Sequence, residues 1–291
     1  MNVAKYSDAS VNGLLAHYDR LETASSNLDI DSERTPLNYS LTPNTGISIE
    51  EYQSSRQARC IVKDIEMQRY KDRRAEVYIY NRQDIKTLAD AVVTAPPELI
   101  GNIEEQKKFF AACANFLFER FGGPPTPDGR LYPNIVSATV HFDEKQLSGE
   151  GLKGHMHVSF MPVVKIDKEK LIAKHNHVKA MEFYDYKVCA NDLITDKELH
   201  KAHVDLRAYL KDKGVKGTVY NKGSSDDSRG RLNLSIKQLK EYTERTGKII
   251  EPEVLQNMTV ERVVDLIEKD LHRDHLRAER DRFMREREKE R

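Results

Sequence analysis

The sequence has no tryptophan, only three cysteines and no net charge. Cys60, Cys113 and Cys189 are far apart and odd in number, which argues against a disulfide framework and against a cysteine-ligated zinc site. No apolar run approaches the roughly 20 residues that span a bilayer, and the N-terminus lacks the charged-then-apolar pattern of a signal peptide. We therefore expect a cytoplasmic protein without membrane insertion, whose cysteines serve in packing.

The charges are balanced overall, with 47 basic and 47 acidic residues, but they are unevenly distributed. This balance excludes a uniformly basic protein that coats nucleic acid, and it excludes a uniformly acidic disordered chain. Residues 51–75 carry 7 basic and 4 acidic side chains, and residues 145–223 carry 15 and 10. The two blocks could contact a polyanion if folding brings them together, although charge alone favours ordinary solvated faces.

Hydrophobic periodicity predicts an α+β protein with several amphipathic helices and a few short strands. The helix that begins at Ser48 has a capping box, because Glu51 follows three residues later. We predict helices at 7–21, from Ser48 into the sixties, at 84–93, 104–121, 196–213 and 235–246, and strands at 75–80, 135–142, 155–162 and 217–220.

The composition changes near the C-terminus, where residues 259–291 carry 10 basic and 10 acidic side chains. This pattern predicts a solvated helix with charge pairs at i, i+4, and a dimeric coiled coil would require the heptads to continue beyond residue 291. The pattern continues to the last residue, which indicates a fragment. We expect one domain at 1–250 and a charged helical tail at 251–291.

Three histidines give the clearest chemical signal. His155 and His157 share one face of a predicted strand, and His141 ends the strand before it. A glycine-rich segment joins these strands in a predicted hairpin, so three imidazoles can surround one point, as in sites for Zn, Mn, Co or Ni. Asp143 and Glu144 lie beside them, and such a cluster is costly unless a cation binds there.

Three motifs in this order resemble those of the MobV-type plasmid relaxases, the plasmid mobilisation and recombination (Mob/Pre) family. They are His17-Tyr18-Asp19-Arg20, Leu37-Asn38-Tyr39-Ser40-Leu41, and His141-Phe142-Asp143-Glu144 followed by His155-Met156-His157. They resemble the family motifs HNxR, NYxL and HxDE…HMH, and the resemblance covers roughly residues 1–245. One departure is the spacer from Lys145 to Gly154, which has ten residues where the family commonly has about three ending in proline.

The resemblance implies an HUH-type relaxase fold, with a central antiparallel sheet, helices on its faces and a divalent metal, Mn²⁺ or Mg²⁺, held by His141, His155 and His157. It also implies a site- and strand-specific nick in supercoiled plasmid DNA at an origin of transfer, a covalent 5′ adduct and rejoining. The expected partners are origin DNA, single-stranded or extruded as a hairpin, a second copy of the chain through its C-terminal helix, and a conjugative coupling protein.

Three residues are candidate nucleophiles, namely His17, Tyr39 and Tyr18. The family resemblance favours His17, with Arg20 one turn along the helix facing the same phosphate or a carboxylate. Strand alternation places Asp143 on the face of His141, whereas the resemblance favours Glu144 as the carboxylate that orients or deprotonates the nucleophile.

The expected DNA contacts are Asn38 and Tyr39, with the Tyr39 ring stacking on an unpaired base. Arg73 and Arg74 are expected to bind phosphate, against the alternative of solvated surface arginines. Two other functions remain open, a rolling-circle replication initiator that uses Tyr39 and a DNA-binding adaptor without catalysis.

Overall fold

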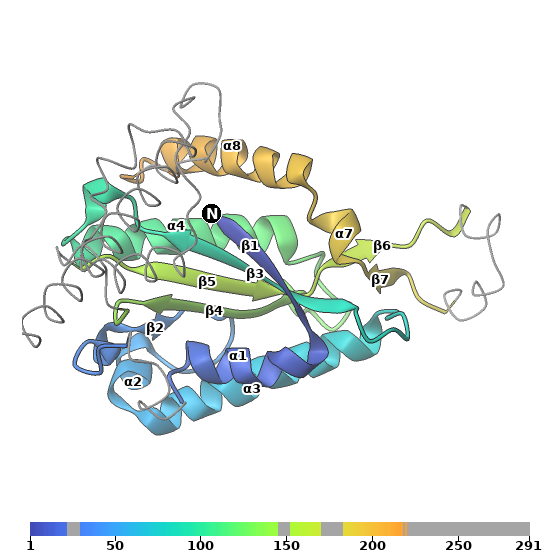
Figure 1. Cartoon of the computed structure of the whole chain (residues 1–291), viewed down its shortest axis with the longest axis horizontal. Coiled ribbons are helices and arrows are strands. Elements are labelled where there is room, and N and C mark those ends of the chain that lie inside the picture. The colour runs from blue at the N-terminus through green and yellow to red at the C-terminus, as the bar shows by residue number, and fades with distance from the viewer. Residues whose placement is uncertain (22–29, 145–151, 170–182, 218, 220–291) are drawn as a thin grey trace, which may run out of the picture. The chain divides into compact units, whose positions relative to one another are not determined.

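The computed structural model of the chain describes residues 1–21, 30–144, 152–169, 183–217 and 219. Its main feature is a five-stranded antiparallel sheet in the order β1-β3-β5-β4-β2 (Figure 1). The strands are β1 (Asn2–Ser7), β2 (Tyr39–Ser40), β3 (Lys86–Thr94), β4 (Ile135–His141) and β5 (His155–Phe160). A separate two-stranded sheet joins β6 (Val163–Lys165) to β7 (Tyr186–Val188). The predicted antiparallel sheet is confirmed.

Helices cover both faces of the five-stranded sheet, with α1 and α3 on one side and α4 and α8 on the other (Figure 1). The helices are α1 (Val11–Tyr18), α2 (Ile49–Ser54), α3 (Arg56–Glu76), α4 (Ile103–Phe121), α7 (Ala190–Leu193) and α8 (Asp196–Asp212), with short 3₁₀ turns at Asp8–Ser10, Thr35–Leu37 and Pro97–Leu99. The α4 face buries the larger apolar core, which includes Phe109, Phe110, Val140 and Met156. Among the described residues, no helix is long and apolar enough to span a bilayer.

Several predicted elements are confirmed near their expected bounds. The helix at 104–121 is α4, the helix at 196–213 is α8, and the hairpin strands are β4 and β5. The capping box at the start of α2 is present, because Ser48 Oγ accepts from the Glu51 amide and the Glu51 carboxylate accepts from the Ser48 amide. The predicted continuous helix beyond Ser48 is interrupted at Ser55, whose side chain caps the start of α3.

Two predicted elements are wrong. Residues 84–93, predicted as a helix, contain most of β3, which lies between β1 and β5 and is buried along nearly its whole length. A strand covered on both faces reads as a continuous apolar run, which periodicity cannot distinguish from a short buried helix. Residues 75–80, predicted as a strand, begin with the last turn of α3, and Tyr78 forms only an isolated bridge to Lys187. Strand β1 was not predicted.

The predicted helix at 7–21 is present as the shorter α1, and residues 217 and 219 of the strand predicted at 217–220 lie in no strand. The other expectations lie outside the described residues, and they are the helix at 235–246, most of the spacer after Glu144, and the charged tail at 251–291. The division into a domain at 1–250 and a tail therefore stays a prediction, as does a dimer through the tail.

Candidate active site

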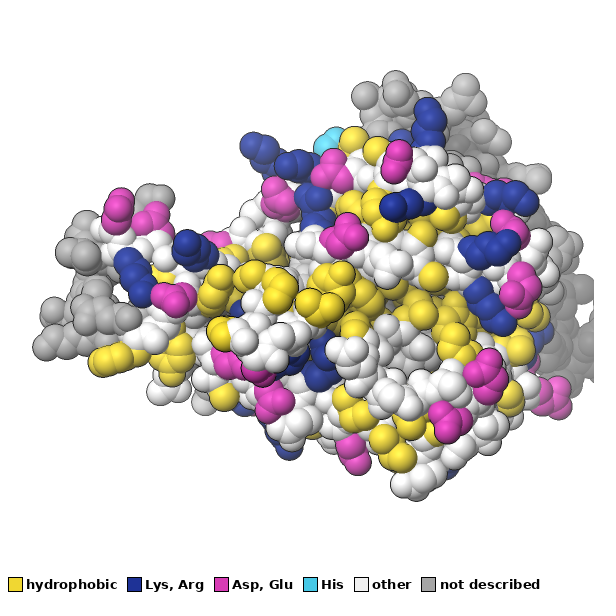
Figure 2. Space-filling model, turned by 180° about the vertical axis from the view of Figure 1, so that it is seen from behind, with side chains coloured by type: hydrophobic (Ala, Val, Ile, Leu, Met, Phe, Trp, Pro, Cys, Tyr) yellow, Lys and Arg dark blue, Asp and Glu magenta, His cyan; other side chains and the backbone are white. Residues whose placement is uncertain are grey.

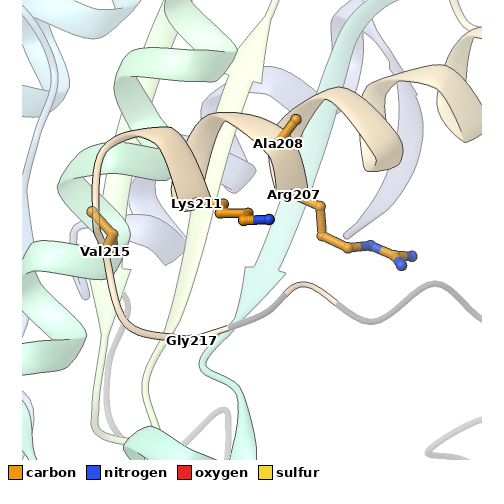
Figure 3. Close-up of a pocket in the computed structure, with 5 residues that line it drawn as sticks. All are labelled: Arg207, Ala208, Lys211, Val215 and Gly217. Carbon is orange, nitrogen blue, oxygen red and sulfur yellow. The ribbon is translucent and has the colours of Figure 1, made fainter.

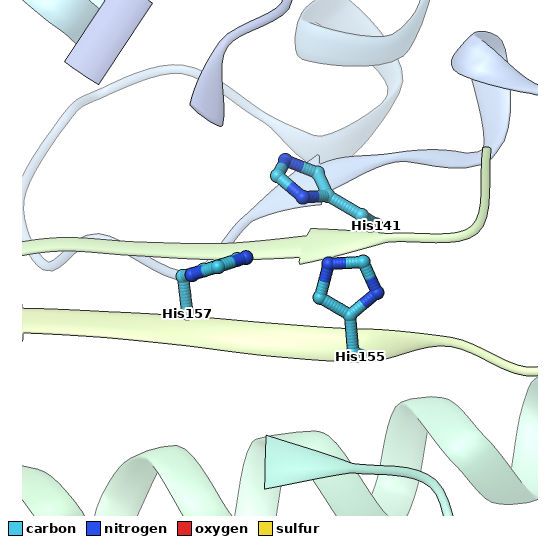
Figure 4. A group of neighbouring side chains, drawn as sticks. All are labelled: His141, His155 and His157. Carbon is cyan, nitrogen blue, oxygen red and sulfur yellow. The ribbon is translucent and has the colours of Figure 1, made fainter. Parts of the chain in front are cut away.

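The three predicted histidines converge on one side of the sheet. His141 pairs directly with His155 across β4 and β5, and His157 pairs with Thr139 two positions along. All three rings project from the same face toward a common space (Figure 4). One nitrogen from each ring lies within 4.8 Å of the others, so the cluster could hold a metal ion.

The His141 ring is held in one tautomer. Its Nε2 lies 2.7 Å from the Tyr18 carbonyl oxygen, and because a carbonyl only accepts, Nε2 is the protonated nitrogen. The other nitrogen, Nδ1, is buried and has no hydrogen-bond partner among the described residues. Burial also lowers the pKa of His141 well below its usual value, so the ring is neutral. A neutral imidazole with an unused buried lone pair is what a metal ligand requires.

The His157 ring is oriented by Asp90, a residue that the sequence analysis missed. His157 Nδ1 lies 2.7 Å from Asp90 Oδ2, and Ser159 Oγ donates to Asp90 Oδ1 at 3.1 Å. Since the carboxylate accepts, Nδ1 carries the proton and Nε2 is free to bind a metal. The Tyr18 ring also stacks on His157 at 4.6 Å between centroids. The available signal was a single acidic residue within the apolar run TLADAVV.

The spacer leaves the register of His155 intact. Gly154 N donates to Gln106 Oε1, and Ala95 N donates to Gly154 O, so the chain is anchored immediately before β5. A Cβ on Gly154 would lie 2.7 Å from the Phe142 ring, which explains a glycine at this position. Burial lowers the pKa of His155 to about 4, and its Nε2 lies 3.5 Å from Glu144 Oε1.

A buried ion pair lies beside the histidines. Arg20 Nε donates to Asp143 Oδ2 at 3.0 Å, and Arg20 Nη2 donates to Asp143 Oδ1 at 2.8 Å. Asp143 also accepts from Asn38 Nδ2 at 2.7 Å and from Thr35 Oγ1 at 2.9 Å. Burial alone would raise the pKa of Asp143, but the hydrogen bonds and charge of Arg20, with these two donors, lower it. Asp143 is therefore an ionised carboxylate whose oxygens are already engaged.

The prediction from strand alternation does not apply beyond His141, where β4 ends. Asp31 N donates to Asp143 O at 2.7 Å, and Ile30 bridges Glu144, so a different segment pairs with the chain here. Asp143 turns into the interior, whereas the Glu144 side chain stays 38% exposed and accepts from Arg20 at 3.1 Å. Glu144 thus lies between Arg20 and His155.

His17 joins this group from α1. Its Nε2 lies 3.2 Å from a terminal nitrogen of Arg20, and its ring centroid is 6.3 Å from that of His141. Because a guanidinium only donates, Nε2 of His17 carries the lone pair. The structure therefore brings together His17, Arg20, Asp143, Glu144 and the histidine cluster.

The predicted DNA contacts in the second motif are buried. Tyr39 is 1% exposed and stacks on Phe142, on the α4 face of the sheet, away from the histidines. A ring in this position cannot stack on a DNA base, so the predicted contact is not supported. The amide of Asn38 is also used internally, since its Oδ1 accepts from Phe142 N and its Nδ2 donates to Asp143. Tyr18, the third candidate nucleophile, is 1% exposed as well.

Arg73 and Arg74 lie away from the histidines. Arg73 is buried and donates from Nε to Asn134 Oδ1 at 2.8 Å, at the opposite end of β4 from His141. Its burial does not support the predicted phosphate contact. Arg74 is half-exposed and forms an ion pair with Asp8 at 2.8 Å. Its phosphate contact stays a prediction.

A pocket of about 400 Å³ lies at the end of α8 and contains none of the predicted residues (Figure 3). Arg207 and Lys211, one helical turn apart, line it together with Ala208, Val215 and Gly217. On the side shown in Figure 2, lysine and arginine side chains are interspersed with aspartate and glutamate. No field of one sign extends over the described part of that side.

Comparisons with known proteins agree with the motifs. A family model described as "Plasmid recombination enzyme" (Mob_Pre) matches residues 1–241. The chain is 26% identical over 216 residues to a plasmid recombination enzyme of Bacillus thuringiensis, covering 74% of this chain and 37% of that protein. It is 26% identical over 243 residues to one of Lactiplantibacillus plantarum, covering 81% and 51%. The chain thus spans only part of the length of these relatives.

Among solved structures, the chain is similar to a Mn-bound crystal structure of the MobM relaxase domain (MOBV; Mob_Pre) bound to plasmid pMV158 oriT DNA. The TM-score is 0.52 with 20% sequence identity, and the match covers 82% of this chain and 96% of that one. This likeness shows a shared fold.

Proposed function

The chain belongs to the plasmid recombination enzyme family, and from this premise we propose that it is a relaxase that nicks one strand of supercoiled plasmid DNA at an origin of transfer. The observation that carries the proposal is the cluster of three histidines, with donor nitrogens within 4.8 Å of one another, beside the Arg20–Asp143 ion pair and His17. An adaptor without catalysis has no evident use for this arrangement.

We infer that His141, His155 and His157 hold a divalent cation. The protonated nitrogens of His141 and His157 face Tyr18 O and Asp90, which leaves the other nitrogen of each ring for the ion. The relaxase of similar fold is Mn-bound, so Mn²⁺ is the first ion to test and Mg²⁺ the second. When bound, the ion would act as a Lewis acid on the nonbridging oxygens of the scissile phosphate.

His17 is the proposed nucleophile. Its Nε2 carries the lone pair and lies beside the histidine cluster on the same side of the sheet. Once the Nε2 lone pair is released from its hydrogen bond with Arg20, its attack on phosphorus would form a P–N bond and break the P–O3′ bond, leaving the 5′ end on the enzyme. The proton lost from the other imidazole nitrogen balances the proton taken up by the 3′ oxygen. Reversal of these steps rejoins the strand.

Arg20 and the two carboxylates support this step. Arg20 contacts His17 and Glu144 at once, so it would orient the nucleophile and meet phosphate charge near it. Glu144 is the exposed carboxylate and would accept the proton from the nucleophile. Asp143 and Asn38 hold Arg20 and the end of β4 in place. Contacts with the DNA beyond the scissile phosphate would come from exposed side chains around His17.

The test is a nicking assay on supercoiled plasmid that carries the cognate origin, with Mn²⁺ or with EDTA, followed by mass spectrometry of the trapped adduct. We expect a metal-dependent adduct on His17, loss of nicking in His17→Ala, and nicking retained in the matched variant Tyr39→Phe. An adduct on Tyr39 would support the replication-initiator mechanism instead. DNA binding without nicking under either condition would overturn the proposed function.

A further inference from the structure

One residue of the first motif has no part in the proposed mechanism, although it lies between two residues of the site. Asp19 separates Tyr18 from Arg20 and directly follows the last residue of α1. It is 0% exposed. A carboxyl group is almost never fully buried unless a partner holds it, so the contact that Asp19 makes inside the protein needs an explanation.

The partner of Asp19 is a tyrosine of α2. Tyr52 is 1% exposed, and its hydroxyl donates to Asp19 Oδ1 at 2.7 Å. The other oxygen, Asp19 Oδ2, is buried without a hydrogen-bond partner among the described residues. Leaving a buried polar group without its hydrogen bond is unfavourable, so the Tyr52 hydroxyl fixes the direction of this side chain.

The helices around Tyr52 are themselves attached to the first two motifs. Arg56, at the start of α3, donates from Nη2 to Leu21 O at 3.3 Å, just after the first motif. Gln53 of α2 donates from Nε2 to Leu37 O at 3.2 Å, in the second motif. The Tyr52 hydroxyl is therefore a fixed point for the chain that follows α1.

The turn after α1 has a backbone conformation that needs support. Arg20 has a φ of 51°, in the left-handed region that most side chains avoid. Its amide donates to His17 O at 3.2 Å, and the Leu21 amide donates to Ala16 O at 2.9 Å, so the turn closes back on α1. Such a conformation persists only where its surroundings determine it, and Asp19 supplies the buried side-chain contact immediately before it.

Both neighbours of Asp19 make contacts in the active site. The Tyr18 carbonyl oxygen, 2.7 Å from His141 Nε2, fixes the tautomer of that ring. Arg20 contacts the proposed nucleophile, with its terminal nitrogen 3.2 Å from His17 Nε2. A displacement of the chain at Asp19 would move these groups together, and catalysis is sensitive to small misplacements of reacting groups.

We propose that Tyr52 is a positioning residue for DNA nicking, acting through its hydrogen bond to Asp19. That bond fixes the turn that carries Arg20 next to His17. The inference rests on the proposed function, and it adds a residue from outside the three motifs. Because Tyr52 is buried and touches no substrate, its hydroxyl affects the nicking step and not the binding of DNA.

The test is single-turnover nicking of supercoiled plasmid carrying the cognate origin, with Mn²⁺ and increasing enzyme, in the variant Tyr52→Phe. We expect the maximal rate to fall about tenfold and the enzyme concentration at half saturation to change less than about twofold, since only the geometry of the reacting groups is disturbed. Tyr70→Phe is the matched control and should nick at the wild-type rate. Tyr70 is also a buried tyrosine whose hydroxyl donates to an aspartate, Asp8, at 2.6 Å.

Substitutions at Asp19 test whether the effect passes through this residue. Asp19→Asn keeps an oxygen that can accept from Tyr52 and should retain at least about half of the wild-type rate. Asp19→Ala should lose about as much as Tyr52→Phe, and the double variant should lose no more than either single variant, because both changes remove the same bond. Multiplied losses in the double variant, or equal losses in Tyr52→Phe and Tyr70→Phe, would overturn the proposal.

The Arg20 Nε–H resonance in ¹⁵N-arginine-labelled protein is a readout that does not depend on nicking. Tyr52→Phe should shift this resonance and speed its exchange with solvent, whereas Tyr70→Phe should leave it unchanged. An unchanged resonance in Tyr52→Phe refutes the positioning role. If the wild type does not nick, the proposed function fails, while the resonance still decides whether Tyr52 holds the turn. Melting curves show which variants are folded, and Asp19→Ala replaces Tyr52→Phe if the latter is unfolded.

Discussion

Replacement of Asp143 with asparagine is expected to destabilise the fold by about 3–5 kcal/mol, the usual cost of breaking a buried ion pair from one side. The Asp143 side chain is 0% exposed and its partner Arg20 is 5% exposed. The carboxylate accepts from Arg20, Asn38 and Thr35. An amide at this position would turn its NH₂ group toward at least one of these donors, and Arg20 would lose its charged partner while it keeps its contacts with Glu144 and His17.

The assay is thermal unfolding in metal-free buffer, checked by urea denaturation. For a domain of 150–250 residues, each kcal/mol lowers the melting temperature by about 2–4 °C, so Asp143→Asn should lose about 6–20 °C. The matched control is Glu144→Gln, which also removes one carboxylate charge next to Arg20. Because Glu144 is 38% exposed, its loss should cost less than about 1 kcal/mol. Equal losses in the two variants would refute the assignment of Asp143 as the buried anchor.

Three further predictions concern metal binding and pH. Mn²⁺ at a hundredfold excess over its dissociation constant should stabilise the wild type by about 2.7 kcal/mol and should not stabilise His141→Ala, as measured by melting. Asp90→Asn should weaken Mn²⁺ affinity about 10–100-fold by calorimetry, and unchanged affinity would contradict the assigned role of Asp90. Burial lowers the pKa of His203 to about 4, so its contribution to stability is present above pH 6.5 and lost as the pH falls toward 4. His203→Gln should reduce this loss by about 1–3 kcal/mol in urea denaturation at pH 7 and pH 4.5, and an unchanged pH dependence would contradict it.

The histidine cluster could be predicted because strand periodicity is local. Alternation places His155 and His157 on one face, and a hairpin connection then brings His141 to the same level. The long spacer did not disturb this register, since Gly154 is fixed by Gln106 and packs against Phe142. The sequence could show the spacer's length but not these anchoring contacts, which come from α4 and from the end of β4.

The environment of single side chains was less predictable. Tyr39 is paired with Val140 in β2 and β4, and this register turns its ring into the α4 core. Arg73 is on the buried face of α3 because that helix extends farther than expected. In both cases the residue type indicates a DNA contact, but the direction of the side chain depends on a pairing or packing partner distant in sequence.

The two adjacent carboxylates of the third motif show how partners distant in sequence give two similar side chains different surroundings. Asp143 and Glu144 have similar chemistry, and the strand alternation that would place them on opposite faces does not apply beyond the end of β4. The strand ends at His141, and pairing with Ile30 and Asp31 then fixes the chain direction. The Asp143 carboxylate accepts hydrogen bonds from Arg20, Thr35 and Asn38, so its charge is balanced and its oxygens are occupied. Glu144 keeps contact with solvent, Arg20 and His155, and this accessibility is the basis for its proposed role in proton exchange.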